Sequence, residues 1–458
     1  MPISRQLLKG RGPAGLSQAL GCSFILFNDY GILQTIDASN SEPVTENCLY
    51  KMNIFVARQP ILKKDKTIYG YELLFRNGME NWFSATNLDE ASLAVIRNAL
   101  LVLGPQKLTG GKKAFINFTR NLLLSEFPSY LPLDSTVIEI LENVEVDQEV
   151  LAACQELKKK GYRLALDDYV WPGPEQNPLT EVVHVIKVDF LRTQPTDRQV
   201  IADFFNPKGV ELLAEKVETR QDFQEAVELG FAYFQGFFFS KPEIIAGKDV
   251  PGYKLSYLEI LKEICRETID FMHFEEIIDR DPPLCLKLLT YLNSVYFGLR
   301  HEVTSIGHAL SLLGEKEIRK WAALAVLTQI GKDQPNELMR LSTVRARFCE
   351  SLAPQVNLAD REAELFLMGL LSLMDVYMGR PLEEVLENIA LAKEIKDALQ
   401  GRENAHKQVL DLVVNYEKGA WENVSPIVAQ LHLDENELPA RYVGAVEFAE
   451  SIPLMFSE

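Results

Sequence analysis

The chain has 458 residues, 47% of them hydrophobic, and a formal net charge of −18 at neutral pH. The hydrophobic content excludes a largely disordered protein, and the length favours two domains over one. The negative charge argues against a protein that coats nucleic acid polymers. It still allows a phosphate-bearing small ligand, because a site can be locally cationic or filled with metal ions.

The sequence shows no sign of a membrane or of an oxidising compartment. No apolar run reaches the roughly 18 residues that a membrane-spanning helix needs, and no polybasic segment suggests a membrane surface. The six cysteines are scattered, without a CxxC pair or metal-ligand spacing, which is typical of reduced thiols. We therefore expect a cytoplasmic protein that does not bind membranes.

Residues 1–51 have no clear periodicity, whereas strand-like alternation begins abruptly at Met52. Two interpretations stay open: Met52 is the natural start of the protein, or residues 1–51 are an ordinary N-terminal extension. From 54 to 75, two alternating apolar runs flank the polar turn KKDK, which predicts a β-hairpin. Residues 88–104 then predict an amphipathic helix that stops at a Gly-Pro pair.

Six runs rich in Val, Ile, Leu and Phe follow, and each ends near an acidic or polar residue. These residues are 20 to 28 positions apart, which suits a strand with its covering helix. The intervals contain helix-like segments such as 147–161 and 220–230. The alternation predicts a βα barrel over residues 52–245, in which the carboxyl ends of all strands meet at one face. The residues at those ends are Asn117, Glu139, Asp167 with Asp168, Lys187, Glu215 and Gln235.

The oxygen-rich residues at this face predict a metal site, because Mg²⁺ and Mn²⁺ prefer oxygen ligands. One ion would be held by strand-end residues together with a glutamate of the hairpin, namely Glu72, Asn117, Glu139 and Asp167. Asp168 would hold a second ion while Asp167 bridges the two, the arrangement that splits phosphodiesters. Lys187 would anchor a phosphate or stabilise developing negative charge, and Glu215 would orient or deprotonate the attacking water.

After the segment 244–253 the strand-like runs stop, and a period of 3.6 residues continues to the end of the chain. This period predicts helices over 257–281, 282–295, 305–330 and 362–378. Residues 254–458 are therefore expected to form a separate all-helical domain.

The motifs of the first part resemble those of EAL domains, the bacterial cyclic di-GMP phosphodiesterases. GYELLFR with Glu72, NF at Asn117, ExxE, DDY, KVD, AEKVE and QGFFFSKP follow one another in the family's order over residues 53–243. The resemblance implies a modified (β/α)8, TIM-like barrel of the α/β class that hydrolyses cyclic di-GMP to linear pGpG with Mg²⁺ or Mn²⁺. It also implies that Glu142 anchors a loop. The residues that it implies as substrate contacts are Arg76, Asp189, Glu218 and Gln235.

Three departures place the chain in a divergent EAL subgroup. The small middle residue of the signature is Leu73 here, and Lys216 stands where the family's AEGVE-type motif has glycine. In the loop 169–179, the segment that in the family couples metal binding to dimerisation is replaced by Val170–Gly173. A displacement of catalytic groups by about 1 Å can cost on the order of a hundredfold in rate, so whether the barrel is active stays open. Because the replaced segment also serves dimerisation in the family, whether the chain forms a homodimer stays open too.

The helical part resembles the HDOD family, a relative of metal-dependent HD phosphohydrolases, over residues 255–375. Where HD enzymes carry a His-Asp metal pair, this chain has Met374 and Asp375. The resemblance therefore implies contact with an unidentified protein partner rather than catalysis. A barrel of EAL type followed by HDOD is a combination found in bacterial signalling proteins.

Two hypotheses follow. In the first, the barrel is an active cyclic di-GMP phosphodiesterase that the helical domain regulates, because all presumed ligands are present. In the second, the barrel binds cyclic di-GMP or a protein partner without turnover and signals through the helical domain, because the loop, Leu73 and Lys216 differ from the family. The complete ligand set favours the first hypothesis.

Overall fold

The computed structural model divides the chain into two compact units, Met1–Asn53 and Ile54–Glu458. The described residues of the first unit form one antiparallel hairpin of β1 (Phe24–Phe27) and β2 (Leu33–Ile36). Of the second unit, the structure describes residues 54–77, 105–171, 177–240, 252–292, 303, 306–387 and 389–456. The helix predicted over 88–104 lies outside the described residues.

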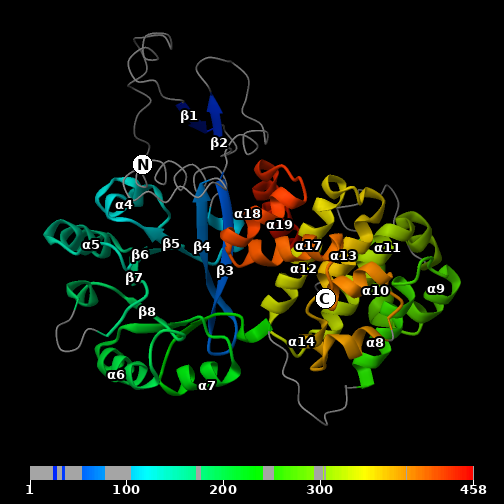
Figure 1. Ribbon diagram of the computed structural model, residues 1–458, viewed down its shortest axis with the longest axis horizontal. Helices are drawn as coiled ribbons and strands as arrows, with labels where there is room; N and C mark the ends of the chain where they lie inside the picture. The colour runs from blue at the N-terminus through cyan, green and yellow to red at the C-terminus, as the bar shows by residue number, and fades with distance from the viewer. Residues whose placement is uncertain are drawn as a thin grey trace. The chain divides into compact units, whose positions relative to one another are not determined.

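Eight strands of the second unit close into a barrel (Figure 1). β3 (Ile54–Lys63) and β4 (Ile68–Asn77) form the predicted antiparallel hairpin. From β4 onward the neighbouring strands are parallel, and β10 closes the barrel by pairing antiparallel with β3. The predicted TIM-like barrel is confirmed, with β3 as the reversed strand. The remaining strands are β5 (Lys113–Phe118), β6 (Thr136–Ile140), β7 (Arg163–Leu166), β8 (Val185–Asp189), β9 (Glu211–Glu215) and β10 (Tyr233–Gln235).

Short helices alternate with the parallel strands of the barrel. The two clearest predicted helices are α5 and α7, and each begins at a side chain that caps it. Asp147 Oδ1 accepts a hydrogen bond from the Val150 N–H at the start of α5, and Thr219 forms a capping box with Asp222 at the start of α7. The helices of the barrel are α3 (Pro105–Thr109), α4 (Arg120–Leu124), α5 (Gln148–Lys160), α6 (Pro195–Phe205) and α7 (Arg220–Glu228).

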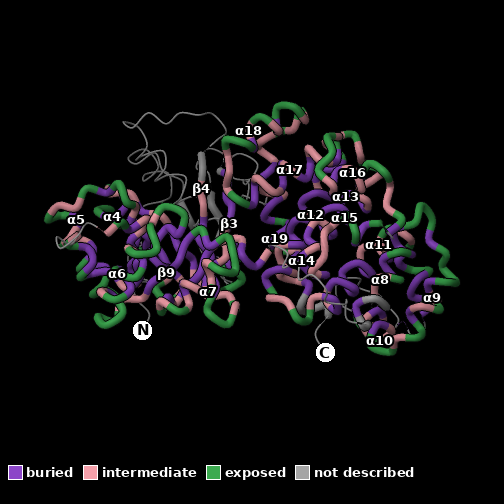
Figure 2. The backbone as a smooth tube through the Cα atoms, turned by 60° about the horizontal axis from the view of Figure 1, so that its bottom comes forward, coloured by how far each residue is buried: buried purple, intermediate pink, exposed green. Residues whose placement is uncertain are grey.

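A layer of apolar side chains fills the inside of the barrel. The strands β6 and β8 are buried along their whole length, and Figure 2 shows the barrel strands mostly as buried backbone. Strands buried on both faces have continuous runs of apolar residues, so these runs in the sequence were enough to predict where the strands lie. The interior layer consists of Ile61, Phe115, Val137, Ala165, Val185, Leu213 and Tyr233.

The described chain from residue 252 onward is helical, as its periodicity predicts. Two of the predicted helices are each divided into two. The segment 257–281 falls into α8 and α9, and Asp270 caps the start of α9 by accepting a hydrogen bond from the His273 N–H. The segment 362–378 forms α13 and α14. The helices are α8 (Gly252–Ile264), α9 (Phe271–Asp279), α10 (Pro282–Leu292), α11 (Ile306–Ile330), α12 (Asn336–Leu352), α13 (Glu362–Leu371), α14 (Met374–Met378), α15 (Leu382–Glu387), α16 (Lys393–Leu399), α17 (Ala405–Glu417), α18 (Trp421–Gln430) and α19 (Leu438–Phe456).

The apolar core of the helices extends onto the barrel. Phe55 of β3 is fully buried and belongs to the helical core. Its ring lies 6.3 Å from that of Tyr416 and 5.9 Å from that of Trp421, so α17 and α18 pack against the β3–β4 hairpin. Among the helices that the structure describes, none is long and apolar enough to cross a membrane.

Candidate active site

A polar layer lies directly above the apolar layer of the barrel. Side chains two positions apart on a strand point to the same side, so the residues that follow the apolar layer by two positions also face the interior. β3 runs in the opposite direction, and there the corresponding residue precedes Ile61 by two. The polar layer therefore consists of Gln59, Glu72, Asn117, Glu139, Asp167, Lys187, Glu215 and Gln235.

Lys187 Nζ is the centre of this layer. It lies 2.9 Å from Asp167 Oδ1, 2.9 Å from Glu215 Oε1 and 3.4 Å from Glu72 Oε2, and it also donates to Glu139 Oε1. The side chains of Lys187 and Glu139 are 1% and 0% exposed. Four carboxylates from four strands thus converge on one ammonium group.

Two amides tie Glu72 into the same layer. Asn117 Nδ2 donates to Glu72 Oε1 at 3.3 Å, and Gln235 Nε2 donates to Glu72 Oε2 at 2.7 Å. Gln235 Nε2 also donates to Gln59 Oε1 at 2.9 Å. Together with Lys187, these amides hold Glu72 by side chains from three other strands, β5, β8 and β10.

Burial sets the protonation of this cluster. Burial and the nearby Glu72 carboxylate raise the pKa of Glu139 well above its usual range. Burial, together with Asp167 and Glu72, raises the pKa of Glu215 to about 8. Burial alone would lower the pKa of Lys187, but the surrounding carboxylates, led by Glu139, raise it well above its usual value. The Lys187 charge in turn lowers the pKa of Asp167 against the effect of burial.

A second group of charges borders this layer. Lys216 Nζ lies 2.5 Å from Asp189 Oδ2 and 3.9 Å from Asp168 Oδ1, and Arg192 Nη1 lies 3.3 Å from Asp168 Oδ2. Asp168 and Lys216 both have positive φ, 40° and 52°, a conformation that favours glycine. Lys216 thus takes the glycine-like backbone of the motif while its side chain neutralises two aspartates.

The donors at the strand ends fit a divalent cation. Asp167, Asp168 and Glu215 each offer a carboxylate oxygen, and these atoms lie within 4.8 Å of one another. Within the part of the chain that the structure describes, four buried oxygens of the polar layer have no hydrogen-bond partner, namely Asn117 Oδ1, Glu139 Oε2, Glu215 Oε2 and Gln235 Oε1. Buried polar atoms are normally satisfied, and a set of unpaired oxygens suits Mg²⁺ or Mn²⁺.

Where the structure describes their side chains, the remaining predicted residues make no contact with Lys187. Glu142 and Glu218 are exposed, after β6 and β9 respectively. Arg76 is in β4 opposite Phe55, but its side chain lies outside what the structure describes. In the helical part, Asp375 is half-buried at the start of α14, where its Oδ1 accepts from the Val376 N–H.

Gln59 is a member of the site that was not predicted from the sequence. It pairs with Glu72 in the hairpin register and faces the interior with it. The alternation of β3 carried this signal, since Gln59 and the interior residue Ile61 are two positions apart.

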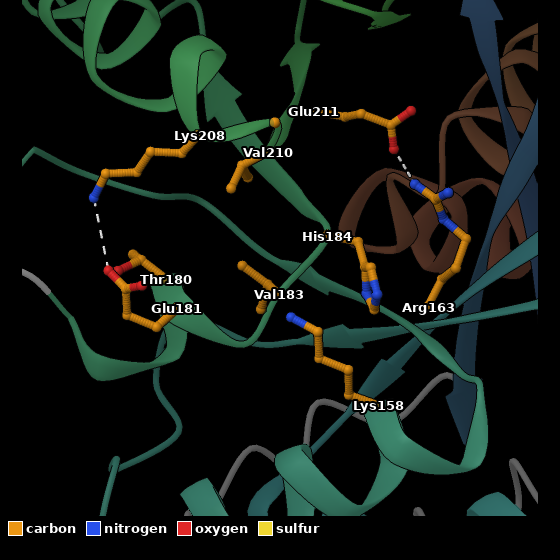
Figure 3. A pocket seen from close by; sticks show the side chains of 10 residues that line it. Lys158, Arg163, Thr180, Glu181, Val183, His184, Lys208, Val210 and Glu211 are labelled. Carbon is orange, nitrogen blue, oxygen red and sulfur yellow. Dashed lines mark hydrogen bonds and ion pairs between the residues drawn. The ribbon is translucent and has the colours of Figure 1, made fainter.

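A separate cavity of about 430 Å³ opens at the other end of the barrel (Figure 3). Its lining includes Arg163, His184 and Glu211, which lie at the amino-terminal ends of β7, β8 and β9. Two of its cations are paired with carboxylates, Arg163 with Glu211 and Lys208 with Glu181. Since chemistry in βα barrels occurs at the carboxyl ends of the strands, we assign the candidate active site to the polar layer and not to this cavity.

Comparison with known proteins identifies both parts of the chain. Residues 49–242 match the EAL domain, and residues 250–413 match the HDOD domain. The chain is 37% identical over 408 residues to the protein YuxH of Bacillus subtilis (strain 168), across 88% of this chain and 99% of YuxH. It is 32% identical over 404 residues to the cyclic di-GMP phosphodiesterase CdgJ of Vibrio cholerae, across 87% of this chain and 93% of CdgJ.

Among solved structures, one match is to an EAL enzyme. The EAL enzyme Bd1971, bound to cAMP and cyclic di-GMP, is 19% identical with a TM-score of 0.34, and the match spans 42% of this chain and 62% of that one. The two domain matches and the relatives aligned over nearly their whole length show that the chain belongs to the family in which an EAL domain is followed by an HDOD domain.

Proposed function

We propose that the barrel is a metal-dependent phosphodiesterase that hydrolyses one phosphodiester bond of cyclic di-GMP to give linear pGpG. The observation that carries the proposal is the group of four unpartnered buried oxygens at the strand ends. The EAL match and the 32% identity to the cyclic di-GMP phosphodiesterase CdgJ support the choice of substrate.

In this proposal two divalent ions would be held at the strand ends. Glu72, Asn117, Glu139 and Asp167 would hold the first, and Asp168 would hold the second together with Asp167. When bound, Mg²⁺ or Mn²⁺ would supply Lewis-acid stabilisation of the phosphate and a water of lowered pKa.

Glu215 and Lys187 take the roles that their surroundings favour. Glu215 has a pKa of about 8, close to neutrality, which suits a group that accepts a proton from the attacking water. Lys187 keeps its charge and orients four carboxylates toward one point, and it is placed to stabilise negative charge on the phosphate. Arg76, Asp189, Glu218 and Gln235 remain the proposed substrate contacts, and Glu142 remains a proposed loop anchor.

The test is hydrolysis of cyclic di-GMP by the full chain with Mg²⁺ and then with Mn²⁺. We expect pGpG from the wild type and a loss on the order of 10²–10³-fold in Glu72→Ala. Glu181→Ala is the matched control, because Glu181 is a 73% exposed carboxylate at the opposite end of the barrel. Equal rates in Glu72→Ala and the wild type would contradict the proposal.

A second candidate function is a barrel that binds cyclic di-GMP without turnover. The ion pairs of Asp168 with Lys216 and Arg192 favour it, because these cations occupy the carboxylate that the second metal ion needs. Cyclic di-GMP that binds in calorimetry but yields no pGpG with either metal would select this candidate.

The helical domain completes the proposal as a regulatory module. Residues 250–413 match the HDOD domain. We propose that this domain contacts a protein partner and relays the state of the barrel to it. Self-association into a homodimer belongs to the same proposal.

A further inference from the structure

The turn between α17 and α18 lies against the carboxyl-terminal mouth of the barrel. Lys418 O accepts a hydrogen bond from Gln59 Nε2 at 3.0 Å. Lys418 Nζ lies 5.4 Å from the ring centre of Phe237, two residues beyond the end of β10. A Cβ on Gly419 would come within 2.8 Å of Leu74 Cδ1. The turn Lys418–Ala420 therefore contacts both strands of the hairpin and the segment after β10.

The strand alternation places this turn over the site rather than on the outside of the barrel. Leu74 follows Glu72 by two positions in β4 and so points to the same side. Gln59 faces the interior opposite Glu72 in the hairpin register. The two side chains of the hairpin that the turn contacts, Gln59 and Leu74, thus belong to the face that carries the carboxylates.

A chain of hydrogen bonds joins the turn to Glu72. Lys418 O binds the Gln59 amide nitrogen, the Gln59 amide oxygen binds Gln235 Nε2, and the same nitrogen binds Glu72 Oε2, at 3.0, 2.9 and 2.7 Å. A glutamine amide donates only through its nitrogen and accepts only through its oxygen. The carbonyl of Lys418 therefore fixes which end of Gln59 faces Gln235.

The turn is held in place by the core of the helical domain. Trp421 follows it directly, with its ring 5.0 Å from Tyr416 and 5.9 Å from Phe55. Gly419 has a φ of +66°, which lets the turn approach Leu74 without a side chain in between. The position of the turn therefore follows the packing of the helices.

We propose that Gln59 is a positioning residue through which the helical domain orients Gln235 and the metal ligand Glu72. The turn Lys418–Ala420 supplies the contact, so the ligand set of the barrel is aligned only while the helical domain is seated. The inference rests on the proposed function in taking Glu72 as a metal ligand, and it concerns metal affinity rather than turnover.

The experiment is calorimetric titration of Mn²⁺ into the full chain, as wild type, Gln59→Leu and Gly419→Ala. Direct partners of metal ligands typically contribute 10–100-fold to affinity. Because Gln59 acts on Glu72 through Gln235, we expect binding that is weaker by up to about tenfold in each variant. The double variant should be no weaker than Gln59→Leu alone, because both changes break one chain of contacts. Leu74→Ala combined with Gly419→Ala should recover affinity by making room for the new methyl group.

Gly401→Ala is the matched control. Gly401 also has positive φ, +80°, in a turn of the helical domain, but nothing lies within 4 Å of its added Cβ. It has the same backbone cost without a contact to the barrel, and its Mn²⁺ affinity should stay within about twofold of the wild type.

The outcomes separate this inference from the proposed function. Gly419→Ala and Gln59→Leu that bind Mn²⁺ as tightly as Gly401→Ala would overturn the inference, whether or not the protein hydrolyses cyclic di-GMP. A wild type that binds Mn²⁺ without hydrolysis, with both variants weakened, would support the inference and reject the catalytic proposal. A wild type that binds no Mn²⁺ would overturn both. In an active protein, both variants should need more Mn²⁺ than the wild type for half-maximal rate.

Discussion

The carboxylates around Lys187 outnumber the cations that are paired with them. Six carboxylates gather here, and three cations are paired with them in the contacts that the structure describes, namely Lys187, Lys216 and Arg192. The carboxylates are those of Glu72, Glu139, Asp167, Asp168, Asp189 and Glu215. Taking an uncompensated charge out of water is costly. The excess negative charge must therefore be neutralised by protons or by bound cations, and the two compete for the same oxygens.

This competition predicts a pH dependence of metal binding. Glu215, with a pKa of about 8, is mostly protonated at neutral pH in the metal-free protein. Binding of Mn²⁺ should then release protons at pH 7 from Glu215 and from the proposed ligand Glu139, whose pKa is also raised, and the affinity should fall as the pH is lowered from about 8.5 to 6. Titration calorimetry in two buffers of different ionisation enthalpy measures the released protons. Glu215→Gln is the control, in which the release should be smaller by the share of Glu215; equal release in both proteins would contradict the assignment.

The same raised pKa fixes the sign of the effect on stability. A carboxyl whose folded-state pKa exceeds its unfolded value of about 4.5 stabilises the fold while it is protonated, and this stabilisation is lost as the pH rises toward about 8. The metal-free protein should therefore lose stability over this window, and the increase in Tm on adding Mn²⁺ should be larger at pH 8.5 than at pH 6.

At the scale of elements, the turns that follow β7 and β9 carry the charges at the proposed second metal position. Each contains a non-glycine residue with positive φ, Asp168 after β7 and Lys216 after β9. Lys216→Gly removes the competing ammonium group and keeps the backbone conformation. We expect the second Mn²⁺ equivalent to bind about tenfold more tightly, because Asp168 and Asp189 lose a cation at 3.9 and 2.5 Å. The stoichiometry and affinity in calorimetry measure this.

Lys66→Gly is the matched control for that prediction. Lys66 has a φ of 63° in the turn between β3 and β4, at the opposite end of the barrel from Asp168. Its replacement relieves the same backbone strain and should leave Mn²⁺ binding unchanged. A similar gain in both variants would trace the effect to stability rather than to the freed aspartates.

The elements that the sequence predicted well are those with strong local signals. The buried strands appear as continuous apolar runs, and parallel strands force their ends to one face, so the convergence of Glu139 and Lys187 followed from order alone. The division of 257–281 into α8 and α9 was missed because the apolar period continues across Asp270, whose capping role depends on the backbone around it.

Contacts between distant segments could not be predicted from local pattern. Lys216 was recognised as a departure from glycine, but its pairing with Asp189 depends on the approach of two turns from different strands. Gln59 was hidden in a strand that the sequence described only as part of a hairpin. Its contact with Lys418 joins residues 359 positions apart, and no period along the chain reports it.

At the scale of the whole molecule, a buried polar cluster fastens the barrel to the helices. Tyr71 Oη donates to Glu337 Oε2 at 2.9 Å, and Arg58 Nη1 lies 3.2 Å from Glu450 Oε1. Arg340 joins the two carboxylates, at 3.0 Å from Glu337 and 2.9 Å from Glu450. Burial raises the pKa of Tyr71, so its hydroxyl remains a donor at any physiological pH. The cluster links β3 and β4 with α12 and α19.

This cluster and the buried Phe55 predict that residues 54–458 unfold as one cooperative unit, consistent with their forming a single compact unit. Calorimetry of the full chain should show one main transition for these residues.

Glu337→Ala leaves Tyr71 without its acceptor and Arg340 without one of its two carboxylates, and removing one partner of a buried ion pair costs about 3–5 kcal/mol. The transition should fall in temperature and begin to separate into two. Glu276→Ala, at a 64% exposed glutamate of α9, should change little, because exposed pairs contribute little. Two resolved transitions already in the wild type would mean that the barrel and the helices fold independently, and the turn at Lys418 would then have no rigid support from which to orient Gln59.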